Sequence, residues 1–445
     1  MLGFSRYLAV GLGLTLTACG ASGEGLELAR SQGEPGVGPG AAWEQVVVGY
    51  QSTCGLRSDR TLWCWGRNQE GQLGDGSTTE RTRPTQVPTP GGPETQEKAG
   101  WEQIAAGYFH TCAVRTGGTL WCWGSNFHGN LGDGTQENHL LPTQVGSGAD
   151  WSAVAVGLEH TCAIRKDGSL WCWGRGASGQ LGVASADTQY APRQVSGPVG
   201  WARVAAGASH TCARRVDGSL WCWGNNDHGQ LGNGIESNQY IPRQVGTGAD
   251  WAQISAENHS CALEEAGSLW CWGHGAEGQI GDGSRSDHFT PKLVESTWEQ
   301  VAVGNGYTCG LRAGGSLFCW GRNDEGQLGD GSTTDHATPA PSGDSARWIG
   351  LATGEGHACA LRSDHSLFCW GANEQGQLGD GTTTPRSVPA MIHLRTNRPG
   401  DRPGLKAEAP GSRKSWVKAA GGGLAGGNRA DQMSEAALRG LDLAI

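Results

Sequence analysis

One unit of about 50 residues recurs seven times along this chain, and it restricts the possible folds more than any other feature. The copies open at Trp43, Trp101, Trp151, Trp201, Trp251, Trp298 and Trp348. Repeats of this length cannot bury their apolar surface alone, so they have to stack on one another. The runs within each repeat are short, apolar or alternating, and bounded by Gly, which predicts strands and not helices.

Repeat four shows the unit clearly. Its four predicted strands cover Trp201–Gly207, His210–Arg214, Leu220–Gly224 and Pro242–Val245. In the third run Leu220 and Cys222 point to one face of the sheet, while Trp221 and Trp223 point to the other. Both faces are apolar, so we expect a neighbouring sheet on each side and these tryptophans in the core. A light-sensing tryptophan array is the alternative role for them.

These features predict an all-β chain that forms a seven-bladed β-propeller of four-stranded blades over residues 43–390. The alternative is an open β-solenoid, which needs atypical repeats to cap its ends. Here the first and last units are as regular as the middle ones. A closed ring explains that regularity, because no end has to be capped.

Fourteen of the fifteen cysteines occur as two per repeat, always ten residues apart. In repeat three the loop Lys166–Gly168 predicts a hairpin in which Arg165 faces Ser169, and this register puts Cys162 opposite Cys172. Zinc ligands usually lie two to four residues apart, which does not fit. We therefore predict one hairpin disulfide per blade: Cys54–Cys64, Cys112–Cys122, Cys162–Cys172, Cys212–Cys222, Cys261–Cys271, Cys309–Cys319 and Cys359–Cys369.

The N-terminus predicts export. Arg6 precedes the apolar run Tyr7–Ala18, which is too short to span a bilayer and is typical of a signal peptide at residues 1–18. Leu16–Cys19 resembles a bacterial lipobox, which implies a lipid on Cys19 and a flexible tether over 19–42. An ordinary signal cleaved elsewhere is the alternative. We expect an outer-membrane lipoprotein, or a protein of the periplasm or cell surface, and the disulfides suit that oxidising location.

The C-terminal segment 391–445 differs from the repeats. It is Gly-rich and basic, and it contains one possible short helix at residues 430–441. It is interpreted as a linker and appendage. The whole chain carries a formal net charge of -10, so nucleic acid is not an expected partner.

The repeat resembles that of the regulator of chromosome condensation family. The resemblance rests on His-Thr-Cys-Ala-Xaa-Arg, Asp-Gly-Ser-Leu-Trp-Cys-Trp-Gly and Asn-Xaa-Xaa-Gly-Gln-Leu-Gly, which recur over residues 43–390. It implies a seven-bladed propeller. The eukaryotic founder is a guanine-nucleotide exchange factor, whereas secreted bacterial relatives, among them a β-lactamase inhibitor, bind a partner with loops on one face. An exported, disulfide-bonded chain is closer to the second group.

Almost every polar motif recurs from repeat to repeat, which favours a structural role because an active site is built once. The Gly-Asp-Gly turns lack the Gly-Lys-Ser/Thr of a phosphate-binding loop and the spacing of a calcium loop. We expect no catalytic residue, metal or cofactor. A histidine two residues before the first Cys is expected to make a structural hydrogen bond; it occurs at His110, His160, His210, His259 and His357, with Ser52 and Tyr307 in its place in repeats one and six.

Two sets of loops vary between repeats, one after the first strand and one after Trp-Gly. Function commonly lies on loops held by a rigid scaffold. In the first set, aromatic residues with a polar rim suit a protein interface. The candidate binding residues are Tyr50, Tyr108, Phe109, Glu159, Glu257, Asn305, Tyr307 and Glu355. The expected function is a monomeric, non-enzymatic protein-binding propeller of the cell envelope; the alternatives are an exchange-factor-like regulator of a small GTPase, and a hydrolase or lyase with a site in the central channel.

Overall fold

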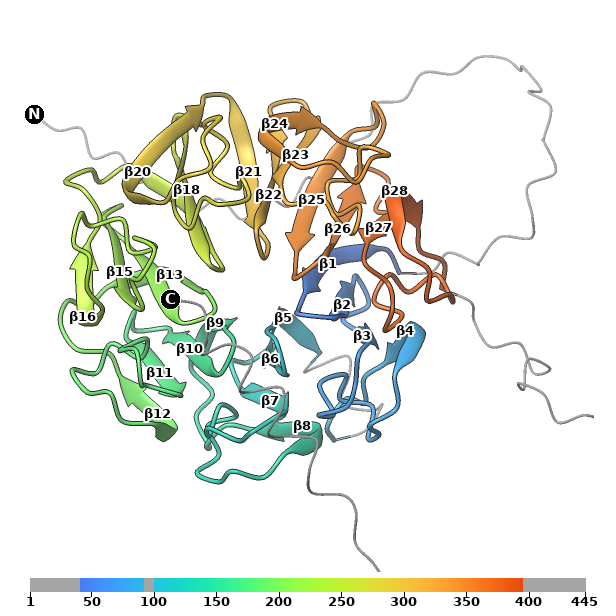
Figure 1. Cartoon of the computed structure of the whole chain (residues 1–445). Coiled ribbons are helices and arrows are strands. Elements are labelled where there is room, and N and C mark those ends of the chain that lie inside the picture. Colours follow the sequence, from blue (N-terminus) through green and yellow to red (C-terminus); the bar gives the residue numbers. More distant parts are fainter. Residues whose placement is uncertain (1–40, 92–99, 395–445) are drawn as a thin grey trace, which may run out of the picture. The chain divides into compact units, whose positions relative to one another are not determined.

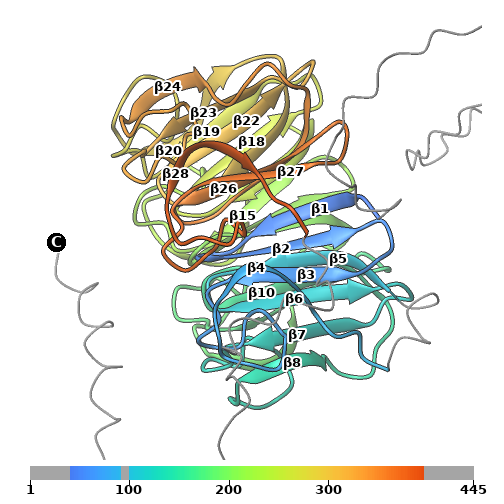
Figure 2. The same cartoon turned by 90° about the vertical axis from the view of Figure 1, so that its right-hand side faces the viewer.

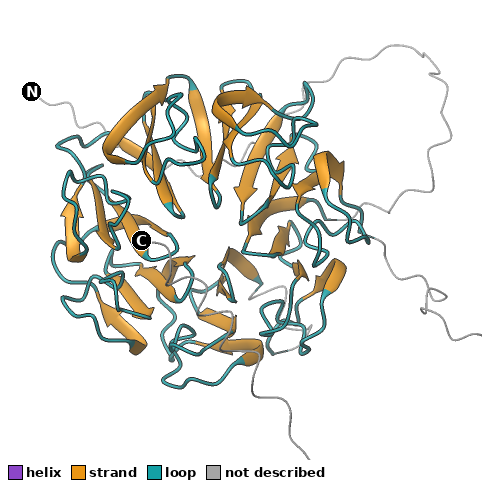
Figure 3. Ribbon diagram, in the orientation of Figure 1, coloured by secondary structure: helices purple, strands orange, loops and turns teal. Residues whose placement is uncertain are grey.

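Seven four-stranded antiparallel sheets form a closed ring in the computed structural model, which describes residues 41–91 and 100–394 (Figure 1). The predicted seven-bladed propeller is confirmed. Figure 3 shows the described residues as strands joined by loops and turns. In the side view, the strands of successive blades lie one above another, so each sheet covers its neighbour (Figure 2).

Each blade uses four consecutive strands in chain order. They are β1 (Trp43–Val48), β2 (Ser52–Arg57), β3 (Leu62–Gly66) and β4 (Arg81–Gln86); β5 (Trp101–Ala106), β6 (His110–Arg115), β7 (Leu120–Gly124) and β8 (His139–Gln144); β9 (Trp151–Val156), β10 (His160–Arg165), β11 (Leu170–Gly174) and β12 (Gln189–Gln194); β13 (Trp201–Ala206), β14 (His210–Arg215), β15 (Leu220–Gly224) and β16 (Gln239–Gln244); β17 (Trp251–Ala256), β18 (His259–Glu264), β19 (Leu269–Gly273) and β20 (His288–Glu295); β21 (Trp298–Val303), β22 (Tyr307–Arg312), β23 (Leu317–Gly321) and β24 (His336–Pro341); and β25 (Trp348–Thr353), β26 (His357–Arg362), β27 (Leu367–Gly371) and β28 (Arg386–Met391).

The predicted hairpin register and all seven predicted disulfides are confirmed. Cys162 faces Cys172 in the β10–β11 pair, and the turn closes where Arg165 and Ser169 meet. The two Cα atoms of every pair lie 4.1 Å apart. This is close to the spacing of directly opposed, non-hydrogen-bonded residues, so the pleat itself brings the sulfur atoms together.

The tryptophans divide into two environments. Trp223 and its equivalents in the other blades are fully buried between sheets, as predicted. Trp221 is only half-buried, because it lies near the hairpin end, where its Nε1–H donates to the Ser219 hydroxyl at 3.0 Å. The expectation that both tryptophans of the third strand belong to the core therefore holds for Trp223 and is wrong for Trp221.

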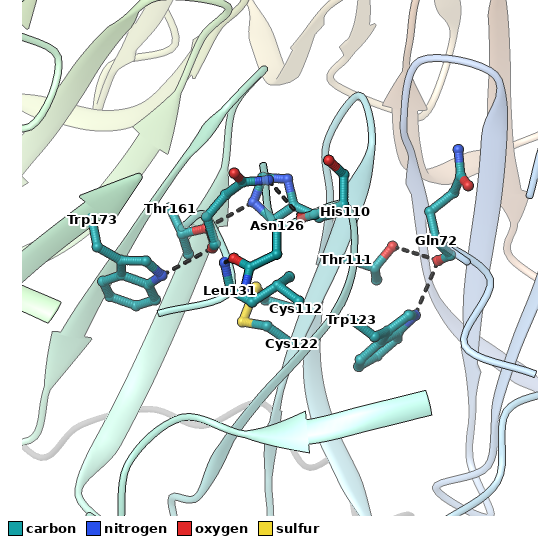
Figure 4. Close-up of a disulfide and its surroundings, with 12 residues drawn as sticks. Gln72, His110, Thr111, Cys112, Cys122, Trp123, Asn126, Leu131, Thr161 and Trp173 are labelled. Carbon is teal, nitrogen blue, oxygen red and sulfur yellow. Dashed lines mark hydrogen bonds between the residues drawn. A yellow bond between two sulfur atoms is a disulfide. The ribbon is translucent and has the colours of Figure 1, made fainter. Parts of the chain in front are cut away.

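Neighbouring blades are joined by the same hydrogen bonds at successive joints. At the first joint the Gln72 carbonyl accepts from the Thr111 hydroxyl at 2.9 Å and from Trp123 Nε1–H at 3.0 Å (Figure 4). At the second joint His110 Nε2 bonds the Thr161 hydroxyl at 2.8 Å. All five histidines of this series bond a hydroxyl of the next blade, at 2.6–2.9 Å. The predicted structural role of the histidines is confirmed.

The joint that closes the ring is like the others. His357 of blade seven bonds the Thr53 hydroxyl of blade one at 2.8 Å. The Gln377 carbonyl accepts from the same Thr53 at 2.7 Å and from Trp65 at 2.9 Å. Both terminal blades come from contiguous stretches of chain, so side-chain hydrogen bonds and packing close the ring without strand exchange between the ends. A closed joint of this kind excludes the open solenoid.

Several expectations fall on segments that the structure does not describe. These are the signal peptide 1–18, Cys19 with most of the tether, and the possible helix at 430–441. Within the described segments, no helix is long and apolar enough to cross a membrane.

Candidate functional site

Both sets of variable loops lie at the same end of the blades. The backbone N–H of Arg67, in the second set, donates to the Gln51 carbonyl in the first set at 2.8 Å, and Arg175 donates to Glu159 in the same way. The hairpin turns, such as residues 166–168, lie at the opposite end of each blade. We call the end that carries the two loop sets the loop face. The sequence identified the two sets but did not predict that they share a face.

Six glycines surround the channel where the inner strands reach the loop face: Gly49, Gly107, Gly157, Gly207, Gly304 and Gly354. A Cβ built on any of them would lie 2.2–2.6 Å from a carbonyl oxygen of the next blade. Only glycine permits this approach, so the inner loops draw close together. Repeat five lacks one residue here, and Glu257 stands where the other repeats have glycine: its N–H donates to the His259 carbonyl, as Gly207 N–H does to His210.

Three predicted aromatic residues gather on one side of this mouth. Tyr50 and Tyr108 stack with ring centroids 4.7 Å apart and an interplanar angle of 24°. Phe109 lies 6.1 Å from each of them. The Arg67 guanidinium sits 5.2 Å from the Phe109 ring centre, a cation–π distance. The rings are half-buried because they cover one another.

Two predicted carboxylates complete the mouth. The Tyr108 hydroxyl donates to Glu257 Oε1, and this bond spans the channel because blades two and five are not neighbours. Tyr50 and Glu355 line the same side of the cavity mouth, where each influences the pKa of the other. Burial raises the pKa of Glu257 to about 7 and also raises the pKa of Glu355. Burial, with the nearby Glu355, raises the pKa of Tyr50 to about 12.

These side chains line a small cavity of about 80 Å³ to which all seven blades contribute. Its walls are the glycines of the inner loops, the ends of the inner strands, Tyr50, Tyr108, Glu257 and Glu355. The cavity combines apolar walls with two acidic groups, a composition typical of small-ligand sites.

The other predicted residues are placed differently. Glu159 pairs with Arg175 at 2.8 Å and with His128 at 3.3 Å. Asn305 accepts from Asn258 Nδ2 at 3.2 Å. The expectation of an accessible aromatic at Tyr307 is wrong: this residue begins β22, is fully buried and donates its hydroxyl to the backbone within a joint.

One exposed aromatic residue of the loop face was missed. Phe127 is 70% exposed and packs edge-on against His128, 4.9 Å away. It lies in the second loop set, whereas the predicted binding residues all lie in the first set or next to it.

The channel behind the mouth widens to a space of about 580 Å³ lined by inner strands. Its Gln side chains are bound to the neighbouring blade: Gln253 donates to the Val301 carbonyl at 2.8 Å and accepts from its N–H at 3.2 Å. These amides pair with the otherwise open edge of the next inner strand. They are not acid–base groups, so they offer no support for a hydrolase or lyase site.

Among residues 41–91 and 100–394, one group of three side chains has its ligand atoms close enough together to hold a metal ion: His228, His274 and Asp287. His228 Nδ1 bonds Asp287 at 2.7 Å. The Gln279 amide, whose oxygen accepts from Glu277 N–H, donates to His274 Nδ1 at 2.8 Å. That bond leaves the proton of the neutral His274 ring on Nε2, so the ring would have to give up the Gln279 bond at Nδ1 or change tautomer to ligate a metal. The group comes from two repeats, and it was not predicted from the sequence.

Family models match most of the chain. A model of the RCC1-like domain matches residues 8–256. A model of the regulator of chromosome condensation (RCC1) repeat matches residues 266–311, 314–361 and 364–423. Together they extend the resemblance through all seven repeats.

Curated relatives match over shorter segments. The ultraviolet-B receptor UVR8 of Arabidopsis thaliana is 32% identical over 102 residues, which is 23% of this chain and 22% of that receptor. The X-linked retinitis pigmentosa GTPase regulator homolog of Caenorhabditis elegans is 34% identical over 93 residues, or 21% of this chain and 6% of that protein. This chain therefore spans less than a quarter of either relative's length.

Solved structures share the fold at low identity. Yeast RCC1 (Prp20), solved bound to Kap60, has a TM-score of 0.67 at 20% identity, covering 84% of this chain and 91% of that one. Human WBSCR16 has a TM-score of 0.66 at 23% identity, covering 73% and 88%. These similarities support the fold alone. The function has to be inferred from the residues of the loop face.

Proposed function

Because the chain belongs to the RCC1-like domain family, whose propellers are generally non-catalytic binding or regulatory domains, we propose that it is a non-enzymatic propeller that binds a protein partner through its loop face. The observation that carries the proposal is the cluster of Tyr50, Tyr108 and Phe109 at the channel mouth. Half-buried aromatic rings with a charged rim are typical of residues that dominate protein interfaces.

The rim of the cluster supports this proposal. Arg67 lies over the Phe109 ring, and the loops of the next blade carry the Glu159–Arg175 ion pair, so both signs of charge occur on the loop face. Exposed Phe127 adds apolar area on the same face. Charges at a rim favour correct orientation and fast association, while the central rings supply most of the binding energy.

We further propose that the protein works as a monomer in the bacterial cell envelope, anchored by a lipid on Cys19. Two features support export: the signal-like segment with Leu16–Cys19, and seven disulfides, which persist in oxidising compartments. Fractionation of cells that express the full chain tests this location. Recovery in membrane fractions, with release by Cys19→Ser, is the expected result; recovery in the cytosol would contradict it.

Affinity capture from envelope extracts tests the binding function. The wild-type protein is compared with Tyr108→Ala/Phe109→Ala, which removes the centre of the aromatic cluster. Loss of a central pair of aromatic residues typically weakens binding by about 2–4 kcal/mol, or roughly 30-fold or more. The expected result is a partner recovered by the wild type and lost by the double variant.

A control variant keeps the experiment interpretable. Val216 is 72% exposed and sits in a hairpin turn at the end of the blade opposite the loop face. Val216→Ala should recover the partner as the wild type does. Equal recovery by the double variant would remove Tyr108 and Phe109 from the site, and loss with Val216→Ala would move the site to the other face.

The second candidate is an exchange-factor-like regulator of a small GTPase. It is favoured by the fold shared with Saccharomyces cerevisiae Prp20p, whose structure is described with its binding to Gsp1p and histones, at 21% identity and a TM-score of 0.63. This function requires a cytosolic location. The fractionation above therefore separates the two candidates.

A further inference from the structure

Glu257 is unlike every equivalent residue in the ring. The six other inner loops have glycine at this position, and the one-residue deletion in repeat five places a carboxylate there instead. The side chain is 8% exposed and reaches across the mouth to Tyr108. A feature that occurs once in seven otherwise similar repeats is not required by the fold.

One oxygen of this carboxylate has no partner. Oε1 accepts from the Tyr108 hydroxyl, whereas Oε2 is buried without a hydrogen-bond partner, although the adjacent Asn258 N–H also favours the ionised carboxylate. A buried carboxylate oxygen without a partner destabilises the folded state, so such atoms call for an explanation. Glu257 lines the 80 Å³ cavity at the mouth, where the missing donor can be supplied from outside.

The charges around Glu257 point to a cation. Glu355 also lines the cavity and disfavours ionisation of Glu257 by charge repulsion. The positive charge of Arg322 lowers the pKa of Glu355, and that of Arg67 lowers the pKa of Tyr50. The pKa of Glu257 shows no such effect of a basic group. Two of the residues that line the cavity are acidic, and none of them is basic.

We propose that this cavity binds a primary ammonium group, presented by a lysine side chain of the protein partner. An ammonium group has three N–H donors. The acceptors that line the cavity are Glu257 Oε2, the Glu355 carboxylate and the phenol oxygens of Tyr50 and Tyr108. The aromatic walls surround the methylene groups of a lysine, which are apolar.

A calcium ion fits the cavity less well. Calcium takes six to eight oxygen ligands. Calcium usually takes its ligands from carboxylates, carbonyls and waters, whereas two of the acceptors here are phenol oxygens, and the positive charge of Arg322 already acts on the Glu355 carboxylate. A lysine on an otherwise apolar contact surface would also explain why the carboxylate stands amid the aromatic cluster.

The proposal rests on the proposed function, because the partner supplies the lysine, but its test needs no partner. Titration calorimetry of the whole protein at pH 8 uses n-butylamine, which reproduces the end of a lysine side chain, and N-butylacetamide, which has the same chain without charge. We expect the amine to bind and the amide not to bind. Calcium chloride is titrated separately and is expected to give no heat.

Two variants locate the binding. Glu257→Gln keeps the size of the side chain and removes its charge, and it should weaken amine binding about tenfold or more. Glu265→Gln is the matched control, since Glu265 belongs to the same blade but lies in its hairpin turn, at the end opposite the loop face, where it pairs with Arg214. The wild type at pH 5, where Glu257 is protonated, should lose affinity as Glu257→Gln does, which tests the site without any substitution.

Several results would overturn the proposal: equal binding of amine and amide, no binding of either, binding of calcium in place of the amine, or unchanged affinity in Glu257→Gln. Failure of the proposed function is a separate result. If the amine binds but Tyr108→Ala/Phe109→Ala still captures the partner, the ammonium pocket stands and the partner interface lies elsewhere. If the amine does not bind and capture still depends on Tyr108 and Phe109, the interface stands without the lysine.

Discussion

The Tyr307 hydroxyl donates to the His357 carbonyl oxygen at 2.5 Å across the joint between blades six and seven. In five other joints a histidine bonds a hydroxyl of the next blade, but here tyrosine replaces the histidine and Ala358 replaces the threonine. The longer tyrosine reaches the backbone directly, so it needs no hydroxyl partner. The two replacements compensate each other, so this joint keeps a hydrogen bond between the blades without the histidine and the hydroxyl.

This compensation predicts a coupling between the two positions. Tyr307→His should destabilise the protein by roughly 2 kcal/mol, because the imidazole has no hydroxyl to bond. Adding Ala358→Thr should restore at least about 1 kcal/mol of the free energy of unfolding by rebuilding the common joint. Chemical denaturation of the single and double variants measures this. Strictly additive effects would show that the two residues are independent.

The five buried histidines predict sensitivity to acid. Burial lowers the pKa of His110, His210, His259 and His357 to about 3, and that of His160 to about 4, below the ordinary 6.5. The unfolded chain takes up these protons below pH 6.5 while the folded chain stays neutral. Stability is therefore full above pH 6.5 and falls as the pH drops toward 4.

Thermal unfolding between pH 8 and pH 4 measures this dependence. His210→Gln should lower the number of protons taken up on unfolding by about one near pH 5. A melting temperature that does not change between pH 7 and pH 4.5 would contradict buried neutral histidines at the joints.

Glu257 predicts a pH effect of the opposite sign. Its pKa is raised to about 7 from 4.5, so the folded protein keeps a proton that the unfolded chain has lost. Stability from this group is full below pH 4.5 and is lost as the pH rises toward 7. Glu257→Gln should therefore be more stable than the wild type at pH 8, by about 2–3 kcal/mol, and equal to it at pH 4.5. A variant that is less stable at pH 8 would mean that the carboxylate is compensated by a neighbour.

The glycines of the channel mouth predict a steric limit. Gly157→Ala places a Cβ 2.4 Å from the Gly207 carbonyl oxygen, which should cost about 1–3 kcal/mol of stability. Gly248→Ala is the matched control, since its Cβ would have no neighbour closer than 3.9 Å. Urea denaturation should show a loss for the first and a change within about 0.5 kcal/mol for the second. Equal effects would mean that the inner loops are not closely packed.

The disulfides predict the thiol content. The denatured, unreduced protein should show no reactive thiol from the fourteen cysteines of the repeats, and about fourteen after reduction. Each hairpin loop is short, so replacing Cys212 and Cys222 together by alanine should cost at most about 3 kcal/mol. Thiol titration with a Cys19→Ser chain removes the remaining cysteine from the count. Fourteen thiols before reduction would contradict the pairing.

The sequence predicts the blades well because the same pattern of strands, turns and cysteines occurs in all seven repeats. The register of Cys162 and Cys172 follows from one short turn, and the histidine bonds follow from their recurrence. The sequence does not predict contacts that arise once and between distant repeats, such as the bond from Tyr108 to Glu257 or the group of His228, His274 and Asp287. Tyr307 was wrongly predicted to be an accessible binding residue because it is aromatic and follows a variable loop. Its position two residues before Cys309, which histidine occupies in five repeats, indicates a buried joint residue instead.

In the proposed complex, a protein partner docks on the loop face over the channel mouth. Hydrogen–deuterium exchange of the protein with and without its captured partner tests this most directly. We expect slower exchange in residues 49–51, 107–109 and 354–356, and unchanged exchange in the hairpin turns at 166–168 and 216–218. Slower exchange confined to those turns, with the mouth unchanged, would contradict the account.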